Sequence, residues 1–217
     1  MNITTRVPVI ALMLAAFAAP GFSNSFSFIG NFVRDNDIAM FEFTMFSADT
    51  VTLQTWSYGG GFNDRGEQVD SGGFEPVLQV YNKPSGAANG PTFFPGLYSS
   101  CGPNNTDPGR HDACFDIYAQ IFLPAGNYWL ILLQNPNAPV GSNNLSDGFQ
   151  FDSNPDFNNG FVGTFGDQGR SDWALDIVNV DDASVSPEPS SAALMAAAAF
   201  LAAMGTRKLR RRTDPRS

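Results

Sequence analysis

The chain has 217 residues, of which 43% are hydrophobic, 13% are aromatic and only 15% are charged. This composition provides enough apolar surface for one principal folded domain and excludes an intrinsically disordered protein. The formal net charge is −9, but residues 24–189 alone contain 5 basic and 20 acidic residues, a net charge of −15. Such an acidic body repels phosphate backbones, which argues against a nucleic-acid partner.

The N-terminal segment, residues 1–23, has the features of a secretory signal peptide. Arg6 lies in a short leading region, and an apolar stretch from Val7 to Ala19 follows. This stretch is too short and ends too abruptly for a good membrane-spanning helix. Small residues ending at Ala18 or at Ser23 both fit a cleavage site, so the cleavage point stays open. We expect a signal helix here and export of the rest of the chain.

Between the two ends of the chain, the dominant hydrophobic period is two residues, as in half-buried strands. Within residues 37–46, the apolar side chains Ala39, Phe41, Phe43 and Met45 fall on one face, and Glu42 and Thr44 fall on the other. Five further stretches show the same pattern: 50–56, 76–82, 115–123, 127–134 and 173–180. Each is rich in β-branched or aromatic residues and is bounded by turn-forming residues.

The stretch 127–134 is apolar on both faces. One face carries Trp129, Ile131 and Leu133, and the other carries Tyr128, Leu130 and Leu132. A strand of this kind is a central strand covered on both sides. Six or more strands joined by long, turn-rich loops, with no sustained helical period, predict an all-β domain over residues 24–185. We expect an antiparallel β-sandwich of the jelly-roll kind.

Cys101 and Cys114 are the only two cysteines and lie in one loop. In an oxidising compartment such a pair predicts a disulfide, which would stabilise the fold by roughly 3 kcal/mol. A zinc site is disfavoured because there is no second thiol pair and His111 is the only histidine.

Two acidic loops suggest a calcium hypothesis. Residues 35–37 and 147–156 mix carboxylates with Asn or Gly, as sites for hard cations do. Neither matches the EF-hand pattern, and the same residue types form turns without any metal. Glu75, placed before a predicted strand, is a further candidate, with a surface residue as the alternative. The candidate Ca²⁺ ligands are Asp35, Asp37, Glu75, Asp147 and Asp152.

No catalytic motif is present: there is no G-x-S-x-G, no P-loop and no H-E-x-x-H. A glycosidase needs only two carboxylates facing a cleft, and an acidic domain can supply such a pair by chance. Trp56, Tyr58 and Trp173 could stack on a sugar, although aromatic residues at strand positions more often belong to the core. We therefore expect a non-enzymatic protein, with a calcium-assisted carbohydrate-binding module as the alternative.

The C-terminal segment, residues 186–212, contains a Pro-Glu-Pro tripeptide, an apolar run from Ala192 to Met204 and then a basic cluster. As a helix, the run would be about 20 Å long, shorter than a bilayer core of roughly 30 Å unless flanking residues are recruited. The basic cluster should stay cytoplasmic and leave the acidic domain outside. The segment predicts an anchor helix that holds the exported domain at the inner membrane, followed by a short tail, 213–217.

This C-terminal segment resembles the PEP-CTERM sorting signal of Gram-negative bacteria. The matching residues are Pro187, Glu188, Pro189, Arg207, Lys208, Arg210, Arg211 and Arg212. The resemblance implies an exosortase as partner, a membrane protease with a cysteine nucleophile that cuts near the tripeptide. It also implies delivery to the cell surface or the extracellular polysaccharide matrix, with a role in biofilm. Here the apolar helix is short and alanine-rich.

The body of the chain also resembles a family, that of uncharacterised exported PEP-CTERM proteins. The motifs TWSYGGG, GGFEP, NNLSDGF and WALDI carry this resemblance, which covers most of residues 50–180. It implies a small β-sandwich similar to pre-peptidase C-terminal domains and no assigned activity. Glu75 stands where the family commonly has Asp, and the family's acidic Asn-Asp-Asp after the next strand is replaced by NKPSGAANG, which weakens a calcium site there.

Overall fold

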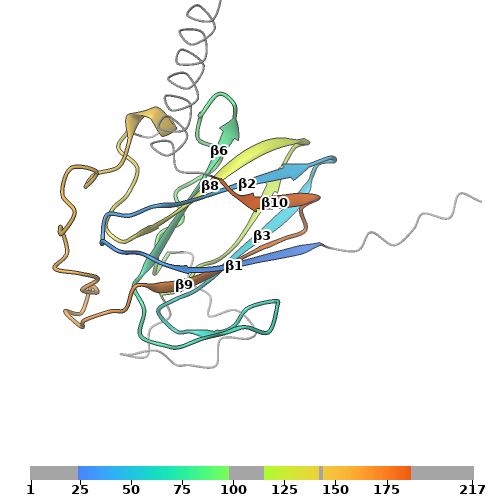
Figure 1. Cartoon of the computed structure of the whole chain (residues 1–217). Helices are drawn as coiled ribbons and strands as arrows, with labels where there is room; N and C mark the ends of the chain where they lie inside the picture. The colour runs from blue at the N-terminus through green and yellow to red at the C-terminus, as the bar shows by residue number, and fades with distance from the viewer. Residues whose placement is uncertain (1–23, 98–114, 142–143, 187–217) are drawn as a thin grey trace, which may run out of the picture.

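The computed structural model of the chain describes residues 24–97, 115–141 and 144–186 (Figure 1). The expected all-β class is confirmed for this part of the chain, where every sheet is antiparallel. The strands are β1 (Ser25–Asn31), β2 (Ala39–Met45), β3 (Asp49–Trp56), β4 (Gly61–Phe62), β5 (Gln68–Val69), β6 (Pro76–Lys83), β7 (Tyr118–Leu123), β8 (Gly126–Gln134), β9 (Asp172–Val178) and β10 (Asp182–Val185). A 3₁₀ turn spans Leu145–Asp147.

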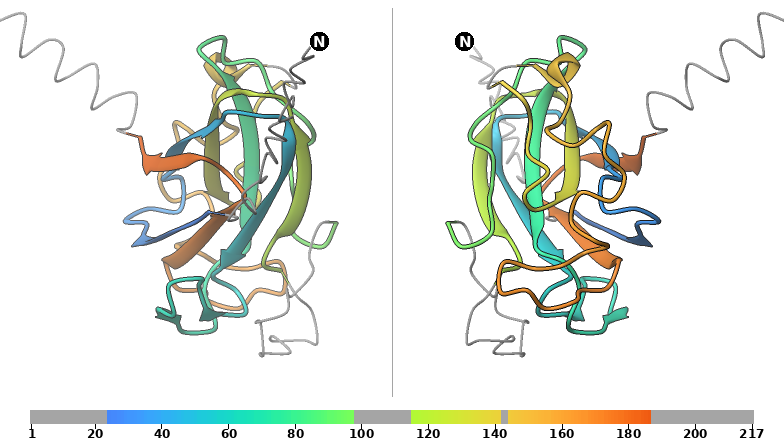
Figure 2. Two further views of the ribbon diagram at one scale, coloured as in Figure 1. Left: turned by 90° about the vertical axis from the view of Figure 1, so that its right-hand side faces the viewer. Right: turned by 90° about the vertical axis from the view of Figure 1, so that its left-hand side faces the viewer.

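Two four-stranded sheets form the body of the molecule (Figures 1 and 2). Sheet 1 has the strand order β1-β9-β3-β7, and sheet 2 has the order β10-β2-β8-β6. The short strands β4 and β5 pair with each other as a separate hairpin.

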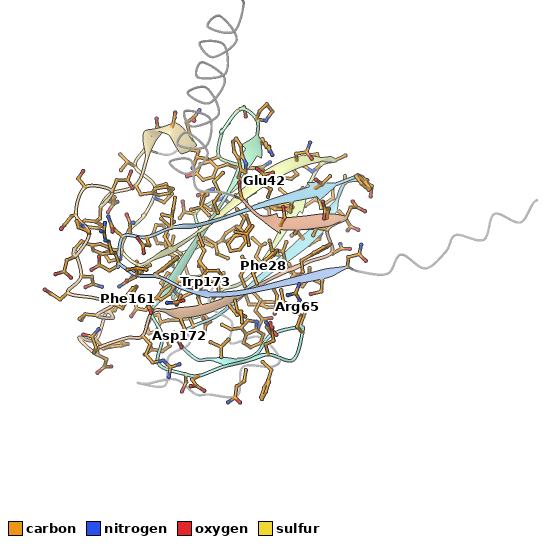
Figure 3. All side chains as sticks on the ribbon, viewed as in Figure 1. Phe28, Glu42, Arg65, Phe161, Asp172 and Trp173 are labelled. Carbon is orange, nitrogen blue, oxygen red and sulfur yellow. The ribbon has the colours of Figure 1, made fainter. Side chains whose placement is uncertain are left out.

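The main hydrophobic core lies between the two sheets, because alternate residues of each strand point inward. Phe28 and Trp173 contribute from sheet 1 (Figure 3), together with Leu53. Phe41 and Leu130 contribute from sheet 2. The predicted inward set of the second strand is correct, since Phe41, Phe43 and Met45 all belong to this core and Ala39 packs against it.

Strand β8 lies between β2 and β6 and is covered on both sides, as predicted. Tyr128, Leu130 and Leu132 belong to the main core. Ile131 and Leu133 belong to a second apolar cluster on the outer face of sheet 2. Residues of the loops that follow β6 and β8, including Phe149, pack on this outer face. Residues 127–134 are therefore apolar on both faces because a second layer of side chains packs on the outer face of sheet 2.

Strands β1 and β10 are not among the six stretches that the sequence analysis selected. Both occupy sheet edges, where β1 pairs only with β9 and β10 only with β2. Edge position alone does not explain the omission, because β6 and β7 also lie at the ends of their sheets and were predicted. β10 is only four residues long, whereas β1 does alternate, with Phe26 and Phe28 packed against the core and Ser27 between them.

Several predicted features lie outside the described residues. These are the signal peptide 1–23, the pair Cys101 and Cys114, and the sorting and anchor segment from Pro187 onward. In the part of the chain that the structure describes, no helix has the length and hydrophobicity needed to span a membrane. The two terminal helices and the disulfide therefore stay predictions.

Candidate functional site

Glu75 is buried, contrary to the alternative of a surface residue at a strand entry. Its two carboxylate oxygens accept hydrogen bonds from the Thr164 amide (2.7 Å), the Thr164 hydroxyl (2.6 Å) and the Asn135 side-chain amide (3.0 Å). The motif GGFEP explains this placement locally. A Cβ on Gly73 would lie 2.4 Å from the Ser57 hydroxyl, so glycine lets the chain pass closely before Glu75. Glu75 thus anchors the loop that precedes β9.

The two predicted acidic loops meet, because the Asn36 side-chain amide donates to the carbonyls of Phe151 and Asp152, but the predicted calcium ligands form no cluster among the described residues. Asp35 is buried, and its Oδ2 accepts from the Asn158 and Gly160 amides at 2.7 and 3.3 Å, while its Oδ1 has no partner among the described residues. Asp37 accepts from the amides of Val33 and Arg34.

The remaining two candidates, Asp147 and Asp152, are exposed. Asp152 accepts from the Phe149 amide at 2.9 Å. Among the described residues, no group of three or more His, Cys, Asp or Glu side chains is arranged to hold a metal ion. The calcium site stays a prediction, and the observed partners of these carboxylates are those of turns and loop anchors.

Two buried carboxylates were missed by the sequence analysis. Asp116 accepts from the amides of Ser57 and Gly59, both at 2.7 Å, and from the Thr55 hydroxyl at 3.1 Å. Burial raises its pKa to about 6, even though these donors favour the charged form. Asp116 thereby fixes the turn that leaves β3.

Asp176 lies on the outer face of sheet 1, beneath the β4–β5 hairpin. It accepts from the Trp56 indole N–H at 2.6 Å, the Ser27 hydroxyl and the Asp64 amide at 3.1 Å. Burial raises the pKa of this carboxyl, against the effect of its hydrogen bonds. Asp176 and Asp116 have their acceptor positions occupied by protein donors, which indicates structural roles.

The three aromatic residues considered as a sugar platform all belong to the interior. Trp56 is fully buried, and Tyr58 and Trp173 are only 5% and 7% exposed. None of them presents a free ring face, so the structure supports the core assignment. The partly exposed tryptophan is Trp129, on the outer face of sheet 2.

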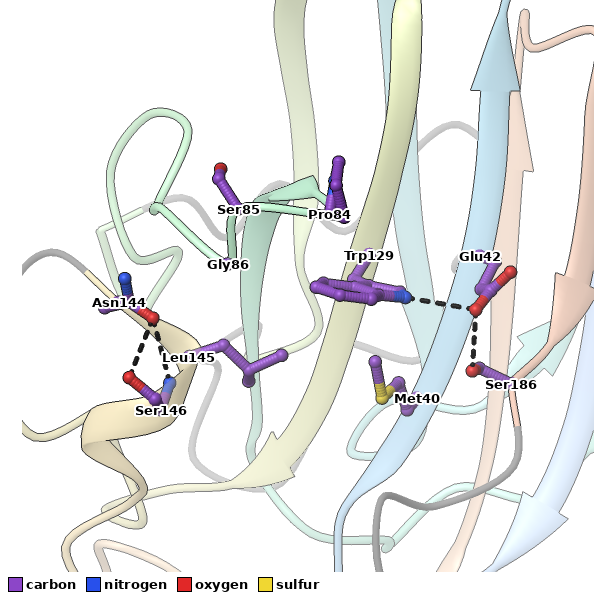
Figure 4. Close-up of a pocket in the computed structure, with 10 residues that line it drawn as sticks. All are labelled: Met40, Glu42, Pro84, Ser85, Gly86, Trp129, Asn144, Leu145, Ser146 and Ser186. Atoms are coloured by element: carbon purple, nitrogen blue, oxygen red, sulfur yellow. Dashed lines mark hydrogen bonds between the residues drawn. The ribbon is translucent and has the colours of Figure 1, made fainter. Parts of the chain in front are cut away.

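Trp129 lines a groove of about 530 Å³ on the outer side of sheet 2 (Figure 4). Met40 of β2 and Leu145 of the 3₁₀ turn supply further apolar surface. The turn after β6 and the segment around the 3₁₀ turn form its sides, and Ser186 lies beside Glu42 at its end. The remaining lining residues are Pro84, Ser85, Gly86, Asn144 and Ser146.

Glu42 organises the electrostatics of this groove. Strand register places it directly opposite Trp129, whose indole N–H donates to Oε1 at 3.1 Å. The Ser186 hydroxyl donates to the same oxygen at 3.0 Å, and the Lys83 ammonium pairs with Oε2. The hydrogen bond from Lys83 is the main reason that the pKa of Glu42 is lowered. Glu42 is therefore ionised at neutral pH, and Lys83 lies 5.8 Å from the centre of the Trp129 ring.

A second hollow, of about 610 Å³, lies beside Trp173 and contains two carboxylates, Asp70 and Asp172. Arg170 pairs with both, at 3.6 and 2.7 Å. The side chains of Asp70 and Asp172 are 71% and 44% exposed, and both pair with the same arginine. This pair is a surface ion network.

The sequence does contain one signal for the groove. A strand that is apolar on both faces requires a covered outer face, and Trp129 stands at the start of that face. The pairing of Glu42 with Trp129 depends on the register between β2 and β8, which the sequence alone does not reveal.

Comparisons with known proteins provide no relative on which to base an assignment. A scan against protein-family models finds no match for this sequence, and a search among curated proteins finds no similar chain.

Proposed function

We propose that the chain is an exported, non-enzymatic protein of the cell surface or extracellular matrix, processed by an exosortase at its Pro-Glu-Pro signal. The observation that carries this proposal is the order of features in the sequence: a signal-peptide pattern, an acidic strand-rich body, then Pro187–Pro189, an apolar run and a basic cluster. Before processing, the domain is held on the periplasmic side of the inner membrane. Afterwards it joins the surface or the exopolysaccharide.

The fold of the body is proposed to be a jelly-roll sandwich, and the strand pairing supports this. Segment 87–93 runs antiparallel to β6 through the bridges Tyr81–Ala88 and Leu78–Phe93. We leave out the β4–β5 hairpin and β10 and count segment 87–93 as the fifth of eight strands. The first strand (β1) then pairs with the eighth (β9), the second (β2) with the seventh (β8), the third (β3) with the sixth (β7) and the fourth (β6) with the fifth. That nested pairing is the arrangement of two Greek keys in a jelly roll.

A binding role is favoured over catalysis by the use of the carboxylates. Glycoside hydrolysis needs two carboxylates that face one cleft, with one of them poised as an acid. Glu42 is the single carboxylate among the described residues that line the Trp129 groove. The calcium-assisted carbohydrate-binding module remains the second candidate, and Asp35 is its best-supported ligand because Oδ1 has no partner among the described residues.

The sorting proposal is tested in the native host by replacing Glu188 with Ala and, separately, by deleting residues 192–212. We expect both variants to change the distribution of the domain between inner membrane, surface and medium. Asp182→Ala is the matched control, because this exposed acid lies on β10, only a few residues before the signal.

Intact-mass measurement of the purified wild-type protein completes the test. A mature chain that ends near Pro187–Ser190 supports processing at the signal. A chain that still carries Arg212, with the same distribution for all variants, would contradict the sorting proposal and indicate a permanent anchor.

A further inference from the structure

We infer that the groove around Trp129 is a calcium-independent binding site for neutral hexose chains. This inference rests on the proposed function for its setting, since a matrix protein meets polysaccharide, and it names the ligand class that the proposed function leaves open. It places the site on sheet 2, away from the aromatic residues and acidic loops that the sequence suggested.

The groove is held in shape by its own contacts. Trp129 donates its indole N–H to Glu42, and the Lys83 ammonium lies over the same ring. The Ser186 hydroxyl and the Lys83 ammonium fix the carboxylate in turn. Because these contacts fix the ring before any ligand arrives, binding requires little ordering of the site.

The surface of the groove combines two chemistries. Met40, Leu145 and the Trp129 ring form an apolar surface, while Ser85, Asn144 and Ser146 place hydroxyl and amide groups around it. A hexose ring has C–H faces that pack on an aromatic face and hydroxyl groups around its edge that need hydrogen-bond partners. Ligand sites generally share this division between apolar contact area and a few orienting polar groups.

Charge determines which saccharides fit. Glu42 is the only charged residue among the described lining residues, and its charge is balanced by Lys83. The surrounding body of the protein is strongly acidic, with 5 basic and 20 acidic residues between positions 24 and 189. Uronate-rich or sulfated chains would be repelled by this field, whereas neutral hexoses would not. A volume of about 530 Å³ lies within the usual range of ligand sites, roughly 300–1,000 Å³.

The test is calorimetric titration of the whole exported chain in detergent, with EDTA present. The probes are neutral gluco-, galacto- and manno-oligosaccharides, with polygalacturonate as the anionic comparison. We expect saturable binding of at least one neutral probe and none of polygalacturonate. Trp129→Ala should weaken binding at least about tenfold, because the stacking surface is lost, and Trp129→Phe should weaken it less.

The matched control is Phe122→Ala, which removes an aromatic side chain that is 67% exposed on β7 of the other sheet. We expect no change in affinity for this variant. Equal affinities in the Trp129 and Phe122 variants, or no saturable heat with any neutral probe, would overturn the inference. Binding that EDTA abolishes would also overturn it, in favour of the calcium-assisted module.

A peptide with the sequence of residues 186–192 tests one alternative ligand of the groove, the chain's own C-terminal segment. If this peptide, and no saccharide, changes the fluorescence of Trp129, the groove is a docking site for the chain's own C-terminal segment and the inference fails. The localisation of the Glu188 variant is measured independently, so failure of saccharide binding and failure of sorting give different results.

Discussion

The outer faces of the two sheets carry the same hydrogen-bonded set in two different surroundings. On each face, a carboxylate accepts hydrogen bonds from a tryptophan indole N–H and a serine hydroxyl. The set on sheet 1 is Asp176, Trp56 and Ser27, and the set on sheet 2 is Glu42, Trp129 and Ser186. The two sets make the same hydrogen bonds, but they differ in how far other parts of the chain shield them from solvent.

On sheet 1, the β4–β5 hairpin closes over the set, with Val69 packed against Trp56 and the Asp64 amide bonded to Asp176. Burial there raises the pKa of Asp176. On sheet 2, Lys83 pairs with Glu42 and lowers the pKa of that carboxyl. The side chains of Lys83 and Glu42 are each 34% exposed. The comparison teaches that the same hydrogen-bonded set can be closed off by a hairpin on one sheet and stay partly exposed beside a groove on the other.

The largest expected effect is on the closed face. Trp56→Ala should lower the free energy of unfolding by about 3–5 kcal/mol, because it leaves a large cavity and removes a donor from buried Asp176. Trp129→Ala should cost about 1 kcal/mol or less, since that ring is partly exposed. Urea unfolding of both variants measures the difference. Similar losses for the two would remove the distinction between a closed and an open face.

The pH dependence of stability tests the buried carboxylates next. Burial raises the pKa of Asp116 from 3.8 to about 6. Between these values the folded state holds the proton that the unfolded state has lost, so the free energy of unfolding falls as pH rises. The expected decrease is about 3 kcal/mol for this one group.

Unfolding of wild type and Asp116→Asn at about pH 4 and pH 7 measures that contribution. The variant cannot titrate, so its decrease should be smaller than that of wild type. Asp182→Asn, at an exposed position, serves as control. An identical pH slope in wild type and Asp116→Asn would show that the carboxyl does not retain its proton on folding.

Removing one charge from each set gives a smaller effect. Asp176→Asn should cost about 2 kcal/mol, because its amide would face donors such as the Trp56 indole N–H and the Asp64 amide. Glu42→Gln should cost less than about 1 kcal/mol, because water can reach that set. Thermal or urea unfolding measures both, and a larger loss for Glu42→Gln would reverse the comparison.

The smallest effect concerns the ion pair of the open set. A double-mutant cycle with Glu42→Gln and Lys83→Met should give a coupling of about 0.5 kcal/mol that declines as salt is added. The coupling free energy is small because the side chains of Glu42 and Lys83 are both 34% exposed, so water screens the pair. A coupling of several kcal/mol that persists in high salt would mean that the pair is shielded from solvent.

The sequence by itself determined the class of the fold and several of its strands. The period of two places Phe41, Phe43 and Met45 on the inner face of β2. Because the buried face of a strand is apolar and the other face is polar, this pattern can be recognised in the sequence alone. The two-faced apolar pattern of 127–134 likewise identifies β8 as central. Strand β10 was missed because four residues are too few to show a period, and β1 was missed although Phe26 and Phe28 alternate with serines as in the predicted strands.

Only the tertiary structure decided which polar residues meet. Asp35 and Glu75 look alike in the sequence as calcium candidates, but backbone and hydroxyl donors from the loop that precedes β9 contact both. Glu42 gave no signal of its own, because strand register brings it to Trp129 and chain closure by β10 brings it to Ser186. Local patterns record whether a residue is buried, whereas contacts between distant segments depend on register and on which loop covers which face.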